Sequence, residues 1–517
     1  MGLSTALKKI ELPHESRWIN QDVRPVDQAR RTWTFLTYHN FWLLINCSIA
    51  TYLTGSSLIP LGLTWWQAII SIVIGNALAT LALVASSLAG AYYHVGFPVF
   101  GRAVWGFWYG FQSWVDGQCV YLILLSWDPD FAQDIPNTIP AQTGTTSAEF
   151  VCYVIFCVVS LPALWIRPHR IQAFFYVSSA ITLAFFLVLL IWALATMGPD
   201  GFGDTLNSGT AIPATGGPSS TAWLMVYGAM STIGSIAAGI LNQNDYSRLA
   251  RRPGDAIWGQ VVAFPLYSIV GYVIGILVTA ATQNRLGGEA VWNPPTLFVA
   301  LLERDNSART RAALFFAGLA LSVSQLGSNL PGNALPGGLD LASVFPQWIN
   351  IRRGAYIIAI LSPVVNPWRL VNTATTFLTV LSGYGKVDDL FSGDSGSIYW
   401  FSAGVNWRAP VAWTIGVVPC MPGFIAAVNT SITVSDGATE MYYMNYLYGF
   451  LASAAVHTFL HRVVPDQKLD AFVKDGIPAK AQRLYGDGRL EVVLAQSPEG
   501  AEAETGHVVH RVKGIDV

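Results

Sequence analysis

The chain has 517 residues, of which 52% are apolar and only 12% are charged, about half the charged fraction of a typical soluble protein. Its formal net charge is −2, so its electrostatics give no reason to expect nucleic acid or another polyanion as a partner. This composition excludes a series of soluble domains and predicts an all-α polytopic protein whose surroundings are the lipid bilayer.

Apolar runs of roughly 20 residues, the length that crosses a bilayer as a helix, recur along the chain. They cover residues 39–61, 65–89, 103–126, 149–166, 172–197, 221–241, 258–281, 311–334, 354–371, 409–428 and 442–460. We number these predicted spans in order, with a shorter tenth piece, NTATTFLTVLSGYG at 372–385, inserted between 354–371 and 409–428.

The distribution of Lys and Arg tests whether the short piece crosses the membrane. If it does, both ends of the chain are cytosolic, and the basic residues left outside are only Arg285, Arg304, Arg309, Arg311 and Arg369. If it does not, this asymmetry largely vanishes. We therefore predict twelve crossings, with a cytosolic tail at 1–38, a transmembrane domain at 39–460 and a cytosolic tail at 461–517.

Small and polar residues interrupt two of the predicted spans. Span one contains NCSIATYLTGSS at 46–57, and span six contains GAMSTIGSIAAG at 228–239. In transporters built from inverted repeats, helices broken in this way expose backbone groups that bind ions or polar ligands near the middle of the bilayer. With a repeat of five spans, one corresponds to six and three corresponds to eight.

Spans three and eight each carry polar residues spaced by one helical turn. Trp108 and Gln112 share a face of span three, and Asn329 and Asn333 share a face of span eight. An indole ring can stack on a flat polar ring, and amide side chains can both donate and accept hydrogen bonds to it. The alternative is structural, because a Trp commonly packs or anchors a span and amides commonly join helices.

Four charged residues are candidates for coupling or gating. Asp116 lies one turn beyond Gln112 and is either a proton-coupling carboxylate or a group in a water-filled vestibule. Asp340 follows span eight, and Asp245 with Arg248 follows span six; these are gating charges or ordinary charges at helix ends.

His457 and His461 are also one turn apart, as a metal pair or as an interfacial anchor, but no third ligand is obvious. We therefore predict no metal site and no cofactor.

Several stretches resemble the nucleobase:cation symporter-1 family, especially its fungal uracil, allantoin and uridine permeases. The matching stretches are RWINQDVRPV at 17–26, TGSSLIPLGLTWWQA at 54–68, GAYYHVGFPV at 90–99, WYGFQSW at 108–114, NDYSRLARRP at 244–253, SQLGSN at 324–329 and INIRRGAYI at 349–357. The resemblance runs from about residue 17 to 475, and WYGFQSW and INIRRG are its most specific parts.

The resemblance implies a LeuT-type fold with a five-plus-five inverted repeat, and secondary active transport of a nucleobase-like small molecule into the cell across the plasma membrane. It implies that Trp108 stacks on the substrate and that Gln112 and Asn333 hydrogen-bond it, with Asn329 beside them. Fungal members are generally proton symporters, and Gly327-Ser328 stands where sodium-coupled relatives place hydroxyl ligands. The ion that the resemblance implies is therefore the proton.

The chain departs from the family pattern at two places. About a helix's worth of residues is missing before WYGFQSW and again after TVLSGYG, so spans three and ten look shortened, and Asp116 and Gln118 replace the usual Gly and Glu. These departures keep open the alternative of a truncated, non-transporting splice or gene-model variant. A membrane-embedded enzyme is a third hypothesis, which the scattered histidines do not favour.

Overall fold

The computed structural model describes residues 11–12, 14–16, 19–59, 61–105, 146–166, 171–198, 217–288, 291–361, 395, 397–402, 404–428 and 431–468. Their regular structure is helical except for one antiparallel pair of very short strands, β1 (His14–Ser16) and β2 (Ile19–Asn20). The predicted all-α architecture is confirmed over these residues, and the small hairpin is an addition that the apolar pattern did not predict.

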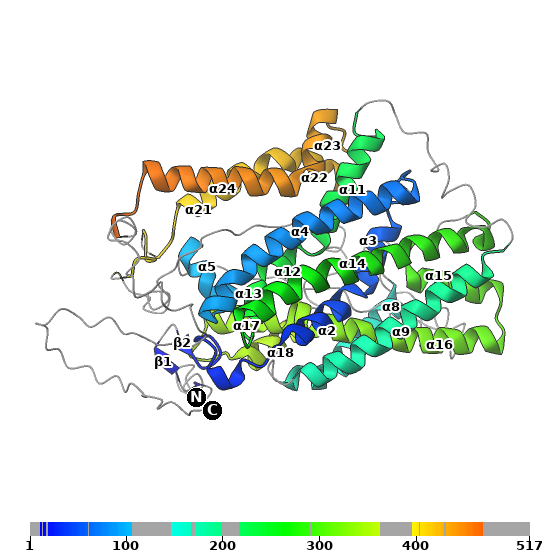
Figure 1. Cartoon of the computed structure of the whole chain (residues 1–517), viewed down its shortest axis with the longest axis horizontal. Coiled ribbons are helices and arrows are strands. Elements are labelled where there is room, and N and C mark those ends of the chain that lie inside the picture. The colour runs from blue at the N-terminus through cyan, green and yellow to red at the C-terminus, as the bar shows by residue number, and fades with distance from the viewer. Residues whose placement is uncertain are drawn as a thin grey trace, which may run out of the picture. The chain divides into compact units, whose positions relative to one another are not determined.

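The first half of the chain forms helices that follow predicted spans one to five (Figure 1). After the short 3-10 turn η1 (Gln28–Arg30) come α2 (Phe35–Asn46), α3 (Ile49–Ser56), α4 (Trp65–Tyr93), α5 (Phe97–Trp105), α8 (Ser147–Ser160) with the turn η3 (Leu161–Trp165), and α9 (Gln172–Thr196). Predicted span three begins within α5, and the rest of that span lies outside the described residues.

The second half contains the remaining helices. They are α11 (Thr221–Ser235), α12 (Ala237–Leu241), α13 (Gln243–Ser247), α14 (Pro253–Gln283) with the turn η5 (Asn284–Leu286), α15 (Pro294–Arg304), α16 (Ala308–Asn329), the π-helical segment η6 (Leu330–Ala334), α17 (Leu335–Val344), α18 (Ile351–Leu361), α21 (Arg408–Val417) with the turn η8 (Val418–Cys420), α22 (Met421–Val428), α23 (Asp436–Tyr443) and α24 (Asn445–Val463). The short piece at 372–385 lies outside the described residues.

Five helical stretches of the described chain are long and apolar enough to cross a membrane. They are Trp65–Tyr93, Gln172–Thr196, Pro253–Leu286, Ala308–Val344 and Arg408–Ala427. Their outward faces carry large apolar side chains such as Leu81, Val188 and Phe316, each about two-thirds exposed or more. In water such faces would be costly, so these helices are suited to contact with lipid.

Span one is broken, as its sequence predicted. Helix α2 starts with a capping box between Thr34 and Thr37 and ends at Asn46, and α3 begins after Ser48. The Ser48 side chain accepts the hydrogen bond of the Thr51 backbone N–H, which caps the second half-helix. The chain therefore leaves backbone groups of two half-helices exposed to neighbouring side chains in the middle of a span.

Span six is also broken, which confirms the second prediction of this kind. Helix α11 ends at Ser235, Ile236 takes φ −112° and ψ 6°, and the short helices α12 and α13 follow. The sequence around the break contains Gly234, Ser235, Ile236 and Gly239, residue types that weaken a continuous helix.

Helix α14 packs along both halves of span one, and Figure 1 shows α14 running beside α4. Gly271 makes the approach possible, because a Cβ added there would lie 2.5 Å from the backbone oxygen of Asn46. Gly55 of α3 is similarly close to α14, since its Cβ would lie 2.6 Å from the oxygen of Tyr272. The small residues therefore hold the break of span one directly against α14.

Candidate substrate site

The last turn of α2 presents backbone carbonyls to serines of α16. The Ser324 hydroxyl donates to the carbonyl oxygen of Cys47 at 3.3 Å, and the Ser328 hydroxyl lies 3.2 Å from that of Leu44. On the other side, the Asn46 side-chain amide donates to the carbonyl of Phe264 in α14 at 3.2 Å. The final carbonyls of a helix have no intrahelical donor, so the two serines supply hydroxyl groups where the break leaves carbonyls unpaired, and the Asn46 contact joins the end of α2 to α14.

The predicted residues Asn329 and Asn333 lie at the point where α16 passes into η6. Asn329 is the last residue of α16 and is half-buried, and Asn333 is the fourth residue of the π-helical segment. The widened turn is seen in the hydrogen bond from the Leu335 N–H to the carbonyl of Leu330, five residues earlier. Such single π turns are frequent at functional sites because they change the direction of the side chains that they carry.

A proline explains why a carbonyl of this widened turn needs a hydrogen-bond donor from another helix. Pro336 has no N–H, so in the five-residue register the carbonyl of Pro331 lacks its intrahelical donor. The hydroxyl of Tyr246, from α13, donates a hydrogen bond to that carbonyl. The segment that carries Asn333 is thereby fastened to the end of broken span six.

The other two predicted substrate-binding residues, Trp108 and Gln112, lie in 106–145, outside the described residues, as does Asp116. Their placement stays a prediction. The structure does place α5, the start of span three, close to α13 and α17. The part of the chain that leads to Trp108 therefore begins beside α17, which follows Asn329 and Asn333, and beside α13, which follows the break of span six.

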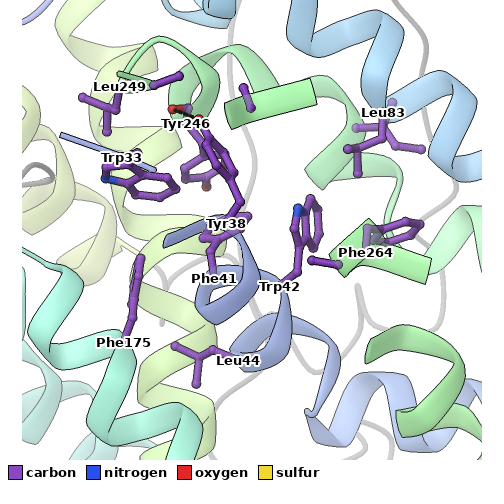
Figure 2. Close-up of a cluster of buried hydrophobic side chains, with 14 of the residues drawn as sticks. Trp33, Tyr38, Phe41, Trp42, Leu44, Leu83, Phe175, Tyr246, Leu249 and Phe264 are labelled. Atoms are coloured by element: carbon purple, nitrogen blue, oxygen red, sulfur yellow. Dashed lines mark hydrogen bonds between the residues drawn. The ribbon is translucent and has the colours of Figure 1, made fainter. Parts of the chain in front are cut away.

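A buried aromatic cluster lies next to this region, and it was not predicted as a functional feature (Figure 2). Trp33 stacks on Tyr246 with ring centroids 6.0 Å apart, and Phe41 lies 4.6 Å from Tyr246. The Tyr38 hydroxyl donates to the backbone oxygen of Tyr246 at 3.1 Å, and Phe175 of α9 contacts Trp33 edge-on. The cluster joins α2, α9 and α13. Its sequence signal is the dense aromatic run at 33–42.

The N-terminal segment 19–33 crosses one end of the bundle, which we call the N-terminal side. The Asn20 side-chain amide donates to the carbonyls of both Pro346 and Ile349, at 3.0 Å each. The Asp22 carboxylate accepts from the backbone N–H of Ile351 at 3.2 Å and pairs with Arg30 at 3.4 Å. The segment therefore binds the connection between α17 and α18, a contact between residues more than 300 positions apart.

Asp245 and Arg248, predicted as gating charges, are both buried on the same N-terminal side. Arg248 donates to the backbone oxygen of Asp245 at 3.3 Å and to that of Asp22 at 2.9 Å. The Asp245 carboxylate instead accepts from the backbone N–H of Phe97 at 2.8 Å. Burial raises the pKa of Asp245 to about 7, although Arg248 and the Phe97 N–H act in the opposite direction.

Asp340, the remaining gating candidate, is part of α17, because the helix continues through η6 beyond the predicted end of span eight. Both Asp340 and Asp245 lie near the Tyr246 hydroxyl, and with burial their charges raise its pKa. Close by, the buried Arg102 of α5 donates to the carbonyl of Ser343 at 2.9 Å. The ends of α5, α13 and α17 thus meet around two carboxylates.

His457 and His461, predicted as a metal pair or an interfacial anchor, both lie in α24. The rings of His457 and His461 are 4.6 Å apart, and Nε2 of His461 lies 3.4 Å from the amide nitrogen of Asn406. Among the described residues no group of three His, Cys, Asp or Glu side chains is arranged to hold a metal ion. The pair therefore has packing and hydrogen-bonding contacts, with no further metal ligand in this part of the chain.

Comparisons of the sequence with known proteins agree with one another. Residues 25–385 and 377–449 match the family described as "Permease for cytosine/purines, uracil, thiamine, allantoin". The division between the two matching stretches falls at the short piece 372–385. The allantoin permease of Saccharomyces cerevisiae is 33% identical, with 86% of this chain and 76% of that protein covered. The uracil permease of the same yeast is 32% identical, with 89% and 79% covered.

Among solved structures, the chain is similar to Mhp1, a nucleobase-cation-symport-1 family transporter, in a closed conformation with bromovinylhydantoin bound. The TM-score is 0.60 at 16% identity, over 89% of this chain and 99% of that one. An inward-facing structure of Mhp1 gives a TM-score of 0.59 over 90% of this chain. This likeness confirms the predicted LeuT-type fold.

Proposed function

This chain belongs to the family of permeases for cytosine/purines, uracil, thiamine and allantoin, the nucleobase:cation symporter-1 family, and we propose that it imports a nucleobase or related small ring compound by proton symport. Its family makes it a transmembrane transporter. The proposal includes the substrate class, the coupling ion, a location in the plasma membrane and the cytosolic position of both termini.

The observation that carries the proposal is the π-helical segment η6 beside two broken spans. It places Asn333 on a widened turn, one turn after Asn329, and Tyr246 fastens that turn to the end of span six. In the proposed site Trp108 stacks on the ring, and Gln112 and Asn333 hydrogen-bond its polar edge. A buried amide left without a partner costs about 1–3 kcal/mol, which gives selectivity against ligands that lack a matching edge.

The missing hydroxyl at Gly327 supports a proton rather than sodium. Exposed carbonyls at broken helices bind sodium in transporters of this architecture. Here the Ser324 and Ser328 hydroxyl oxygens lie 3.3 and 3.2 Å from the carbonyl oxygens of Cys47 and Leu44, but residue 327 is a glycine. The family resemblance places hydroxyl ligands of sodium-coupled relatives at 327 and 328, so this chain lacks one of them.

Two other hypotheses receive no support from the comparisons. Relatives matched over most of this chain are named as permeases, which argues against a membrane-embedded enzyme. A truncated, non-transporting variant is not favoured either, because the similarity extends over at least three-quarters of the length of these relatives.

A binding experiment on the purified protein tests the proposed site. Uracil, allantoin and uridine would each be titrated against wild type and against the variants Gln112→Ala and Asn333→Ala, with Asn40→Ala as a matched control. Asn40 donates only to Leu36 in its own helix and is outside the proposed site. We expect saturable binding of at least one compound, weakened by the first two substitutions and unchanged by the control. Unchanged binding in Gln112→Ala would remove that residue from the site.

A further inference from the structure

The Asp245 carboxylate is enclosed by the connection between α4 and α5. Asp245 is only 6% exposed, and its Oδ1 accepts the backbone N–H of Phe97 at 2.8 Å. A Cβ added to Gly96 would lie 2.8 Å from the same oxygen, so the connection presses directly on the carboxylate. The second oxygen, Oδ2, is buried and has no hydrogen-bond partner in the described part of the chain.

The cationic side chains of Arg248 and Arg31 donate hydrogen bonds to backbone oxygens and not to the Asp245 carboxylate. Arg248 donates hydrogen bonds to the carbonyls of Asp245 and Asp22, and Arg31 donates to the carbonyl of Val26. Within the described residues no cationic side chain lies within ion-pair distance of the Asp245 carboxylate. A buried carboxylate with one hydrogen bond and no ion pair is far cheaper to keep protonated than charged.

Of the other groups on the surrounding elements, the cation Arg102 of α5 donates to the carbonyl of Ser343 at 2.9 Å, and the titratable side chains supply no positive charge beside the carboxylate. His94, in the α4–α5 connection, contacts the carbonyl of Arg248 through Nδ1 at 3.0 Å. Burial and the charge of Arg31 lower the pKa of His94 to about 4, so it is neutral at physiological pH. Tyr246 and Asp340 face the same region, and the N-terminal segment contributes Asp22 and Arg30 as a pair. The groups of this region that can take up a proton are therefore the two carboxylates, and of these Asp245 has an oxygen, Oδ2, that is buried without a hydrogen-bond partner in the described part of the chain.

We propose that Asp245 is a proton-binding residue of this transporter, protonated while the N-terminal side is closed and deprotonated when that side opens. The inference rests on the proposed proton symport and assigns it a site. Asp245 lies where α13, the α4–α5 connection and α17 meet, with Leu339 against Gly96. Separation of these elements would admit water and release the Phe97 N–H.

The direction of the pH effect follows from burial. The pKa of Asp245 is raised in the closed arrangement and returns toward that of an exposed carboxyl when water enters. Lower pH on the N-terminal side therefore stabilises the closed arrangement, and this stabilisation is lost as the pH rises through about 7. A proton bound in the closed arrangement would leave on the side where substrate is released.

The first test needs no substrate. Infrared difference spectra of the purified protein, recorded between acid and alkaline pH, would report the carbonyl band of a protonated carboxyl group. We expect a band that titrates near neutral pH in wild type, is absent in Asp245→Asn and persists in Asp22→Asn and Asp340→Asn. A band that survives in Asp245→Asn but disappears in Asp340→Asn would overturn the assignment.

A second variant covers the case in which Asp245→Asn does not fold. Arg248 lowers the pKa of Asp245, so Arg248→Gln should move the midpoint of the same band to higher pH. The equivalent change at an exposed arginine three residues further along the chain, Arg251→Gln, should leave the midpoint in place. An unmoved midpoint in Arg248→Gln would contradict the assignment without any change to Asp245.

Transport by the protein in lipid vesicles gives the functional test. We expect Asp245→Asn to retain substrate exchange between equal pH on both sides and to lose accumulation driven by a pH gradient. Full pH-driven accumulation by Asp245→Asn would refute the role of Asp245. If wild type exchanges none of the ring compounds tested, the proposed substrate class fails instead, while the infrared titration still decides the protonation of Asp245.

Discussion

The Tyr246 hydroxyl donates a hydrogen bond to the backbone carbonyl of Pro331, and this contact joins the end of broken span six to the π-helical segment of span eight. Tyr246 also stacks on Trp33 and receives a hydrogen bond from Tyr38 at its own carbonyl. One side chain therefore connects the N-terminal segment, both broken spans and the segment that carries Asn333.

Removing that hydroxyl should destabilise the protein and weaken substrate binding. Tyr246→Phe keeps the ring and leaves the Pro331 carbonyl buried without a donor, which costs about 1–3 kcal/mol. The thermal unfolding midpoint in detergent should fall, and the KM for uptake should rise because the turn that carries Asn333 loosens. Tyr176→Phe, on the exposed face of α9, is the control and should change neither quantity. Equal midpoints for both variants would show that the contact is dispensable.

The close approach of α14 to span one predicts opposite effects of the same substitution at two glycines of one helix. Gly271→Ala introduces a methyl group 2.5 Å from the Asn46 oxygen and should destabilise the protein by about 1–3 kcal/mol. Gly254→Ala meets nothing within 4 Å and removes the flexibility of glycine in a helix, so it should be neutral or stabilising by about 0.5–1 kcal/mol. Thermal unfolding of the two variants would compare them directly, and a tolerated Gly271→Ala would contradict the packing.

The presence of only one hydroxyl in the pair Gly327-Ser328 predicts that sodium has no role in uptake. The Ser328 hydroxyl lies 3.2 and 3.0 Å from the carbonyl oxygens of Leu44 and Ser324 and can donate its one hydrogen to either, while Gly327 beside it supplies no hydroxyl. Replacement of external sodium by choline at constant pH should therefore leave the initial uptake rate of wild type unchanged. A rate that rises saturably with sodium concentration would show that these oxygens do bind the ion.

The docked N-terminal segment should be released by loss of a single side chain. Asn20 donates to two carbonyls of the α17–α18 connection and is almost fully buried. Asn20→Ala leaves both carbonyls without this donor, so tryptic cleavage at Arg30 and Arg31 should become faster. Asn40→Ala, whose amide bonds only within α2, should be cut at the wild-type rate. Equal rates for Asn20→Ala and wild type would mean that other contacts hold the segment.

Local patterns predicted the breaks of spans one and six, because serines, glycines and threonines weaken a helix wherever they occur. The π turn at η6 was harder to foresee. It depends on Pro336 and on a hydroxyl from Tyr246, 85 residues away in the sequence. The burial of Asp245 under Phe97 also depends on a long-range contact. These residues are 148 positions apart, so the local sequence pattern around either one could not predict it. The roles of Trp108 and Gln112 remain predictions from helical spacing and motif resemblance, and that of Asp116 remains a prediction from helical spacing.

The most direct test of the proposed function is uptake of labelled uracil and allantoin by yeast cells that lack their own permeases and express this protein with a fluorescent tag. Initial rates would be measured at acid and at alkaline external pH. We predict saturable uptake of at least one compound, faster at acid pH and abolished by a protonophore. Protein present at the cell surface with no saturable uptake, or with uptake that ignores both pH and the protonophore, would contradict proton-driven import of this substrate class.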